Sequence, residues 1–277
     1  MTGQLLRVVT ASSQREPVRA GEHWPLQRVL PVFTFGALIG IWWFLVELFR
    51  PAPYLVPHPT RVLAEGVGNW DELSSNMGST IQIALVGLAA SVGLSVVLAF
   101  AAWRWGVVRR VMMPPLIMSQ SIPKIALAPL LVVWFGYGAL PKLVIVILVT
   151  IYPLTVGLLV GLNGVSTNVL NLCRSMGMTL PAQLWKIFLP ASAPHFASAF
   201  KVSASLALIG AIIAEYVGSE NGIGTVLLQA IGTQNTSLTI AAILLCAVSG
   251  TAIYLLAALL TRLSAIGLGQ NYMEANQ

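Results

Sequence analysis

The stretch NLCRSMGMTLPAQLWKIFLP, Asn171–Pro190, lies between two long apolar segments and holds two cations and no carboxylate. Its larger apolar residues recur at roughly helical spacing. They are Leu172, Met176, Leu180, Leu184, Trp185 and Phe188. Such periodicity is typical of an amphipathic helix that lays one face on another surface. The stretch is therefore predicted to pack against a partner or a surface, and the rest of the chain indicates which.

The composition is that of a membrane protein. The 277 residues are 57% hydrophobic and only 9% charged, whereas soluble domains carry about 25% charged residues. The mean hydropathy is +0.83. Six stretches are close to the roughly 20 apolar residues with which an α-helix crosses a bilayer. They are about Leu30–Phe49, Thr80–Trp103, Val111–Trp134, Leu143–Leu162, Ala197–Val217 and Leu238–Leu260.

The expected fold is all-α, with six transmembrane helices in one domain over residues 27–265 and tails at residues 1–26 and 266–277. The third stretch is the least regular, because four prolines interrupt it and Lys124 lies inside it. A long connection over about residues 163–194 contains the opening stretch.

The cations indicate topology. The net charge of +6 is spread over the ends of the apolar stretches and is not clustered on one face, so nucleic acid is not an expected partner. Cytoplasmic loops are enriched in Lys and Arg, and six spans place both termini on one side. With the N-terminus inside, the cytoplasmic cations are Arg7, Arg15, Arg19, Arg28, Arg104, Arg109, Arg110, Arg174, Lys186, Lys201 and Arg262, against Arg50, Arg61 and Lys142 outside.

The opening stretch also carries a family pattern. Gly177 is followed by nine residues and then by IFLP, residues 187–190. This spacing resembles the cytoplasmic loop of the membrane subunits of bacterial ABC importers, which reads Glu-Ala-Ala, three residues, Gly, nine residues and Ile-x-Leu-Pro. The Glu-Ala-Ala positions fall on NLC, residues 171–173, and do not match.

Three further stretches are similar to one subgroup of these permeases, which serves importers of nitrate, taurine, alkanesulfonates and vitamin precursors. SIPKIALAPLLVVWFGYGALPK, Ser121–Lys142, resembles its third span and the turn that follows. AEYVGSENGIG, Ala214–Gly224, resembles the end of its fifth span, and LVPHPTRVLAEG, Leu55–Gly66, its first outside loop. The similarity extends over roughly Val56 to Leu260 and implies a type I ABC importer-like permease fold in a bacterial inner membrane.

The resemblance implies that the opening stretch forms a coupling helix that docks in a groove of a cytoplasmic ATPase. The positions it assigns to this contact are Asn171, Leu172, Cys173, Met176, Gly177, Met178, Leu180, Ile187, Leu189 and Pro190. The implied partners are two ATPase subunits, an extracytoplasmic substrate-binding protein and a second permease copy, which would make a homodimer. The chain has no G-x-x-x-x-G-K-[ST] loop, so ATP and Mg²⁺ are expected on the ATPases and the chain itself is expected to be non-catalytic, without cofactor or metal.

The residues of the stretch suit such a contact. Gly177 permits a left-handed backbone at which a helix stops, and Asn171 is placed to cap a helix start. Met176 and Met178 offer adaptable apolar contacts for a protein groove, while Leu184, Trp185 and Phe188 are expected to pack under the transmembrane bundle. The alternative is an amphipathic helix that lies on the lipid surface.

Two ionisable residues are candidates for the transport pathway, Lys124 within the third span and Glu215 near the outer end of the fifth. Lys124 either lines the path and attracts an anionic substrate, or bonds carbonyls that Pro123 frees. The structural interpretation is favoured, because related subgroups carry a similar Pro-Lys or Pro-Pro pair whatever the charge of their substrate.

The expected function is that of the permease subunit of a binding-protein-dependent importer. The form of the third span favours a vitamin precursor such as a pyrimidine or riboflavin, ahead of sulfonates, taurine or nitrate. The alternative is an ion-coupled secondary transporter that works alone. Such transporters often show inverted repeats and intramembrane carboxylates, and the sequence offers neither.

The charge asymmetry predicts that both termini are cytoplasmic. After replacement of Cys173 and Cys246, a single cysteine at Asn221 should react with a membrane-impermeant thiol reagent in intact cells. A single cysteine at Ser12 should react only after the membrane is opened. Labelling of Ser12→Cys in intact cells, with Asn221→Cys protected, would reverse the topology.

Overall fold

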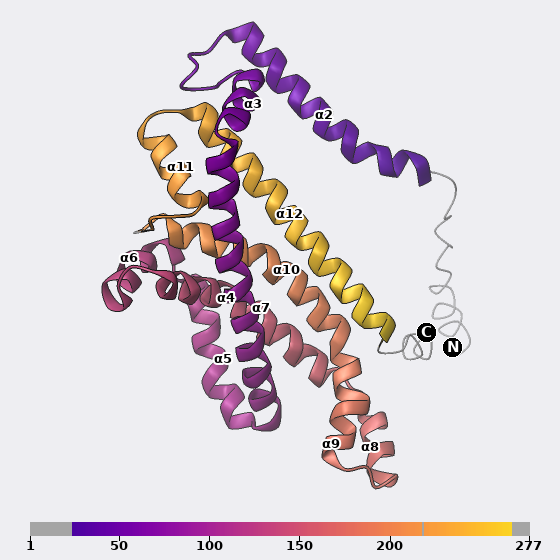
Figure 1. Ribbon diagram of the computed structural model, residues 1–277. Helices are drawn as coiled ribbons and strands as arrows, with labels where there is room; N and C mark the ends of the chain where they lie inside the picture. The colour runs from indigo at the N-terminus through magenta and orange to yellow at the C-terminus, as the bar shows by residue number, and fades with distance from the viewer. Residues whose placement is uncertain (1–23, 218, 268–277) are drawn as a thin grey trace, which may run out of the picture. The chain divides into compact units, whose positions relative to one another are not determined.

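The computed structural model describes residues 24–217 and 219–267, and these residues form helices and loops with no β-strand. The predicted all-α fold is confirmed. Most of the predicted tails, residues 1–23 and 268–277, lie outside the described residues. The chain divides into two compact units, residues 1–50 and residues 51–277. Figure 1 traces the helices of both units.

The first unit contains α2 (Trp24–Phe49), which includes the predicted first span. From Gly36 to Phe49 it is a continuous apolar helix. Its large side chains are exposed, for example Phe44 at 64% and Phe49 at 73%. An apolar helix with exposed Phe and Leu side chains is suited to a hydrocarbon surrounding.

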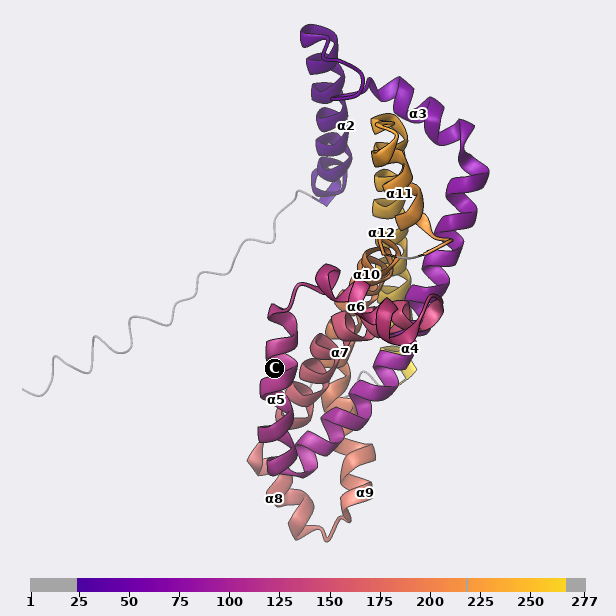
Figure 2. The ribbon, with the colours of Figure 1, turned by 90° about the vertical axis from the view of Figure 1, so that its left-hand side faces the viewer.

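Four long helices form the core of the second unit: α4 (Trp70–Arg104), α7 (Ala139–Asn163), α10 (Leu189–Glu215) and α12 (Thr236–Gly267). Each is long and apolar enough to cross a membrane. α7 packs along both α4 and α10, and α12 packs on α10; Figures 1 and 2 show these helices side by side. The predicted second, fourth and sixth spans lie inside α4, α7 and α12, and the fifth lies on α10 except for its last two residues.

Small residues bring these helices together. A Cβ added to Gly161 of α7 would lie 2.5 Å from the Ser192 Cα of α10, and one added to Gly87 of α4 would lie 2.5 Å from the Val146 Cγ1 of α7. Between membrane helices association depends on such close packing, because lipid tails are as apolar as the side chains they replace. Ser91 and Thr150 add a buried hydrogen bond of 2.6 Å between α4 and α7.

The third stretch, which prolines were expected to interrupt, is a sharply bent pair of helices. The segment forms α5 (Gly106–Ser121) and α6 (Lys124–Phe135), which meet at an angle of 106°. Pro123 has no N–H and disfavours the helical conformation of the residue before it; Ile122 is accordingly extended at φ −77° and ψ 126°. Among the described residues, four helices are long enough to cross and the bent pair makes at most a fifth, so six crossings are not confirmed.

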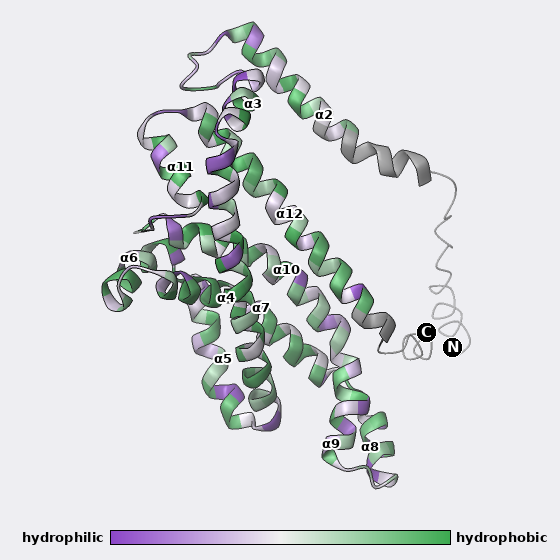
Figure 3. Cartoon of the chain, in the orientation of Figure 1, coloured by the Kyte–Doolittle hydropathy of each residue, from purple (hydrophilic) through white to green (hydrophobic). Residues whose placement is uncertain are grey.

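Short helices cap the two ends of the second unit (Figure 1). At one end, called here the α8 end, lie α8 (Thr167–Ser175), α9 (Leu180–Gln183) and a π-helical turn η1 (Leu184–Phe188) that leads into α10. At the other, the α11 end, lie α3 (Pro59–Gly68) and α11 (Ile223–Gly232). Figure 3 shows that apolar residues dominate the long helices between these ends.

The packing of α7 on α10 predicts a difference between two glycines. Gly161→Ala should lower the free energy of unfolding by about 1–3 kcal/mol, because the new methyl group meets the backbone of Ser192 and forces the helices apart. Gly93→Ala is the matched control: it also lies within a helix, but an added Cβ has nothing within 4 Å. Thermal unfolding in detergent measures both, and equal unfolding temperatures would show that the close approach does not stabilise the bundle.

Candidate functional site

The α8 end contains the residues assigned to the ATPase contact. α8 begins after Ser166, whose Oγ accepts a bond of 3.5 Å from the Val169 N–H. Asn171 was expected to cap the helix start, and this is wrong, because Asn171 lies in the middle of α8. Its Oδ1 instead accepts a 3.2 Å bond from Arg174 Nη1. A serine whose side chain satisfies a free N–H is a common helix start.

Gly177 ends α8 as predicted, in the left-handed conformation at φ +66°. The Gly177 N–H donates to the Arg174 carbonyl at 3.0 Å, and the Met178 N–H donates to the Cys173 carbonyl at 3.0 Å. This pair of bonds is a Schellman motif, which satisfies carbonyls that a helix end would otherwise leave free. A Cβ at Gly177 would have nothing within 4 Å, so only its backbone conformation demands glycine.

The assigned residues divide between two faces. Leu172, Met176 and Leu180 are 59%, 68% and 46% exposed, whereas Cys173 is 3% exposed and faces the protein interior. Asn171 and Gly177 are also exposed. The remaining assigned residues are partly buried and belong to the segment around η1; they are Met178, Ile187, Leu189 and Pro190. α8 therefore presents an uncovered row of apolar side chains at the end of the bundle.

The segment after Gly177 joins this face to the bundle. Phe188 is 5% exposed, and its ring lies 4.7 Å from that of Trp103, centroid to centroid. Leu184 packs against the same cluster, as predicted for both residues. The prediction for Trp185 is wrong, because its side chain is 75% exposed. The π-helical turn changes the phase of the helix here, so spacing alone misplaces the indole.

Glu215 occupies the opposite end of α10 and is 1% exposed. Its carboxylate accepts bonds from the Thr80 hydroxyl, 2.9 and 3.0 Å from its two oxygens, and from the Gly224 N–H at 2.9 Å. Thr80 Oγ1 in turn accepts from the Ile223 N–H at 2.9 Å. The carboxylate therefore ties α4, α10 and the start of α11 together, in the place where the positive end of a helix favours an anion.

The glycines of this turn are required by the carboxylate. Gly222 has φ +126°, and an added Cβ would meet the carboxyl group of Glu215. A Cβ on Gly224 would lie 2.7 Å from the Glu215 Cβ. The Gly222 N–H also donates to Asn76 Oδ1 of α4 at 2.8 Å. Glu215 therefore makes buried contacts that hold this turn in place. Its role in the transport pathway stays a prediction.

Lys124, the other pathway candidate, lies at the start of α6. Its Nζ donates to the Gln120 carbonyl at 2.9 Å. In a continuous helix the Lys124 N–H would use that carbonyl, but the break at Pro123 frees it. The contact is the one that the structural interpretation of Lys124 anticipates. Lys124 and Glu215 are placed on different elements, and no contact between them is recorded in the described chain.

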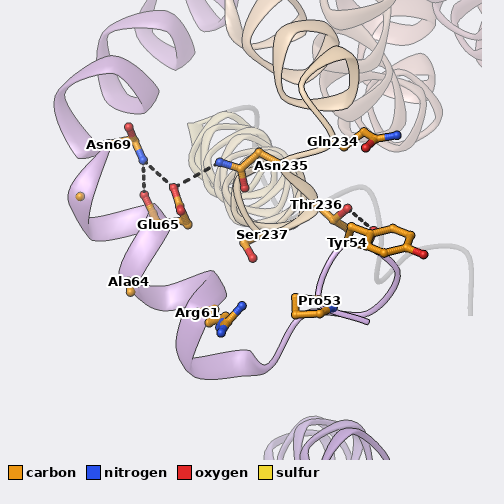
Figure 4. A pocket seen from close by; sticks show the side chains of 11 residues that line it. Pro53, Tyr54, Arg61, Ala64, Glu65, Asn69, Gln234, Asn235, Thr236 and Ser237 are labelled. Atoms are coloured by element: carbon orange, nitrogen blue, oxygen red, sulfur yellow. Dashed lines mark hydrogen bonds between the residues drawn. The ribbon is translucent and has the colours of Figure 1, made fainter. Parts of the chain in front are cut away.

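Sequence reasoning gave no signal for a polar cleft at the α11 end. The cleft, of about 810 Å³, lies between α3 and the loop that joins α11 to α12. Glu65 is at its centre: Asn69 Nδ2 donates to the Glu65 carboxylate at 3.0 Å, and Asn235 Nδ2 approaches the same oxygen at 3.5 Å (Figure 4). Thr236 donates to the Tyr54 carbonyl at 2.6 Å. Asn235 and Thr236 are far in sequence from Glu65 and Tyr54, so only the fold brings these two pairs together.

Within the described residues no group of three or more His, Cys, Asp or Glu side chains is placed to hold a metal ion. The candidate sites are therefore an uncovered apolar surface at the α8 end, and at the α11 end a buried carboxylate and a polar cleft.

The sequence is similar to those of known proteins. The family profile of the binding-protein-dependent transport system inner membrane component matches residues 91–265. The formylaminopyrimidine transport permease protein of Halalkalibacterium halodurans is 32% identical over 199 residues, which cover 72% of this chain and 79% of that protein. The riboflavin transport system permease protein of Chloroflexus aurantiacus is 28% identical over 87% of this chain and 90% of its own length. The taurine transport system permease protein of Escherichia coli is 25% identical over 73% and 77%.

The buried carboxylate predicts the effect of removing its donor. Thr80→Val keeps the shape of the side chain, but deprives Glu215 of a hydrogen bond and the Ile223 N–H of its acceptor. Hydrogen bonds to charged groups stabilise proteins by about 1.5–3 kcal/mol, so thermal unfolding in detergent should show a loss of that order.

Thr251→Val is the matched control for this variant, because the exposed Thr251 hydroxyl bonds only the Ala247 carbonyl of its own helix. It should unfold at nearly the temperature of the unmodified chain. The same unfolding temperature for both variants would mean that the Glu215 contacts do not hold the α11 end together.

Proposed function

The chain belongs to the family of binding-protein-dependent transport system inner membrane components, and from that membership we propose that it is the permease subunit of an ATP-driven ABC importer. It is a multi-pass membrane protein with four long apolar helices among its described residues. In the proposal two ATPase subunits bind the α8 end, a substrate-binding protein docks at the α11 end, and two permease copies form the pathway between them.

The uncovered face of α8 carries the proposal. Leu172 and Met176 lie at the α8 end of the bundle, and both side chains are more than half exposed. Exposed apolar patches of this kind mark interaction sites. The Schellman motif at Gly177 ends α8. The buried Cys173 of α8 and the buried Phe188 of η1 attach this segment to the bundle. A helix that packs on the bundle with one face and exposes apolar side chains on the other is suited to bind in a groove of a partner protein and to pass the movements of that partner to the bundle.

The missing Glu of the family loop changes the chemistry of this contact. Arg174 is the one charged residue of α8, and it is bonded within the helix to Asn171. The proposed docking therefore depends on apolar fit by Leu172 and Met176, since the helix offers no carboxylate for a cation of the ATPase. Methionine at such a surface adapts readily to the shape of its partner.

The proposed orientation places the α8 end and both termini in the cytoplasm, in agreement with the excess of cations there. The polar cleft around Glu65 and Asn235 would then face outward and offer hydrogen-bonding groups to the binding protein. ATP hydrolysis belongs to the partner subunits, because the chain lacks a phosphate-binding loop.

The substrate that we propose is a small polar vitamin precursor of the aminopyrimidine class. The formylaminopyrimidine permease protein is 32% identical, against 28% for the riboflavin protein and 25% for the taurine protein. Riboflavin, sulfonates, taurine or nitrate are the other candidates. Identification of the ligand that co-purifies with the partner binding protein decides among them.

The coupling role predicts a specific sensitivity at Gly177. Gly177→Val should reduce co-purification of the ATPase roughly tenfold and reduce transport with it, because a β-branched residue at φ +66° carries about 1–3 kcal/mol of strain and reshapes the end of α8. Gly177→Asn should retain most of the ATPase co-purification and most of the transport, since Asn tolerates this left-handed conformation.

Gly136→Val is the matched control. Gly136 also has a positive φ, +75°, and open space around it, but it lies at the end of α6. This variant should keep its full complement of ATPase whatever its effect on transport. Normal ATPase association of Gly177→Val, or equal losses in both valine variants, would remove the support for a coupling helix.

A further inference from the structure

A second cleft, of about 390 Å³, lies where the coupling segment meets the bundle. Its walls come from the last turn of α4, the end of α7, α8 and the segment around η1. The lining residues are Trp103, Arg104, Leu162, Asn163, Val165, Leu170, Arg174, Leu180, Gln183 and Phe188. Leu180 is the one lining residue that was also assigned to the ATPase contact, and the proposed docking residues Leu172 and Met176 do not line the cleft.

The cleft has a positive charge that no carboxylate of the described residues neutralises. Arg104 and Arg174 both line it, and no carboxylate does. The sequence has no Asp or Glu at all between Leu73 and Ala214. In the described chain the one ion pair joins Arg50 and Glu47, and neither residue lines this cleft. Arg174 donates only to the neutral Asn171 side chain among recorded partners.

Helix ends offset only part of this charge. Arg104 is in the last turn of α4 and Arg174 in the last turn of α8, where the free carbonyls are equivalent to about half a negative charge. A guanidinium carries a full positive charge, so each arginine retains an excess directed at the cleft. Two such groups suit a phosphate oxyanion, which arginine binds through paired N–H donors.

The other wall of the cleft is apolar. The Trp103 and Phe188 rings pack edge to face at 4.7 Å between centroids, and the partly buried Val165 and Leu170 continue the surface. Trp103 lies one residue from the end of the membrane-spanning helix α4, at the level where tryptophans gather at the membrane–water interface. A free anion would make no favourable contact with this apolar wall, whereas the glycerol and upper acyl chain of a lipid would pack against it.

We propose that this cleft binds the phosphate group of an anionic phospholipid, with Arg104 and Arg174 on the phosphate and Trp103 and Val165 against the glycerol backbone. Basic pockets between membrane helices are suited to anionic headgroups. The bound lipid joins the coupling segment to the ends of α4 and α7, and so braces the element that carries the exposed face of α8. This inference depends on the chain being a membrane protein and does not depend on the proposed ATPase contact.

The test uses the full chain, delipidated in a neutral detergent and titrated with phosphatidylglycerol while bound lipid is counted by native mass spectrometry. Arg104→Gln combined with Arg174→Gln should weaken phosphatidylglycerol binding about 30-fold, since one basic residue contributes about fivefold at such a surface. Phosphatidylcholine should bind weakly to all forms. Thermal unfolding without lipid verifies that the double variant is folded.

Arg109→Gln combined with Lys186→Gln is the matched control. It removes the same charge from the same end of the molecule, but neither residue lines the cleft, so phosphatidylglycerol binding should change less than threefold. Equal losses in the two double variants would overturn the site. Inorganic phosphate at matched ionic strength forms the second arm: if it displaces phosphatidylglycerol at comparable concentration, the cleft is a free phosphate site and the lipid assignment is overturned.

Discussion

Close packing of α7 on α10 holds the two ends of the second unit in a fixed relation. At Gly161 the backbones approach so closely that a single methyl group would meet Ser192 Cα at 2.5 Å. α10 is continuous through η1 and α9 with the segment that follows Gly177, and its other end finishes at Glu215. Closely packed interiors transmit displacements because they have little free volume. In the proposed mechanism a push on α8 would therefore be carried along α10 toward the turn that Glu215 fixes.

The helices themselves were predictable because the bilayer imposes their length and composition. The stop at Gly177 was also predictable, since a left-handed residue after a helix favours glycine. The bend at Ile122 was visible only as an accumulation of prolines. The sequence does not indicate which of them breaks the helix, because proline within a membrane helix is tolerated where neighbours satisfy the freed carbonyls.

The errors and omissions have two origins, which are tertiary contacts and a local change of helical phase. Glu215 reads as an ordinary carboxylate near a span end, and its partners Thr80 and Gly224 become neighbours only after the helices assemble. The closely spaced glycines of GSENGIG were the available signal for this contact, because they are typical of a backbone that another group approaches closely. Trp185 was misplaced because η1 shifts the helical phase, and helical periodicity assumes a uniform helix.

In the described part of the second unit the carboxylates gather at the α11 end. The α11 end holds the buried Glu215 and the partly buried Glu65 among hydrogen-bond donors, while the α8 end holds arginines without carboxylates. The first arrangement is satisfied by the chain itself and fixes a turn. The second is not, and for this reason we propose a protein groove as the partner of the apolar face of α8 and an anionic headgroup as the ligand of the cleft beside it.

The most direct measurement of the central claim places a photoreactive benzophenone side chain at Met176, the most exposed residue of the α8 face, in cells that also express the candidate ATPase. Illumination should join the chain to the ATPase, and the same probe at the exposed Val133 of α6 should not do so. If the Met176 probe reacted only with lipid, α8 would be a membrane-surface helix, and the account of this end as an ATPase contact would be contradicted.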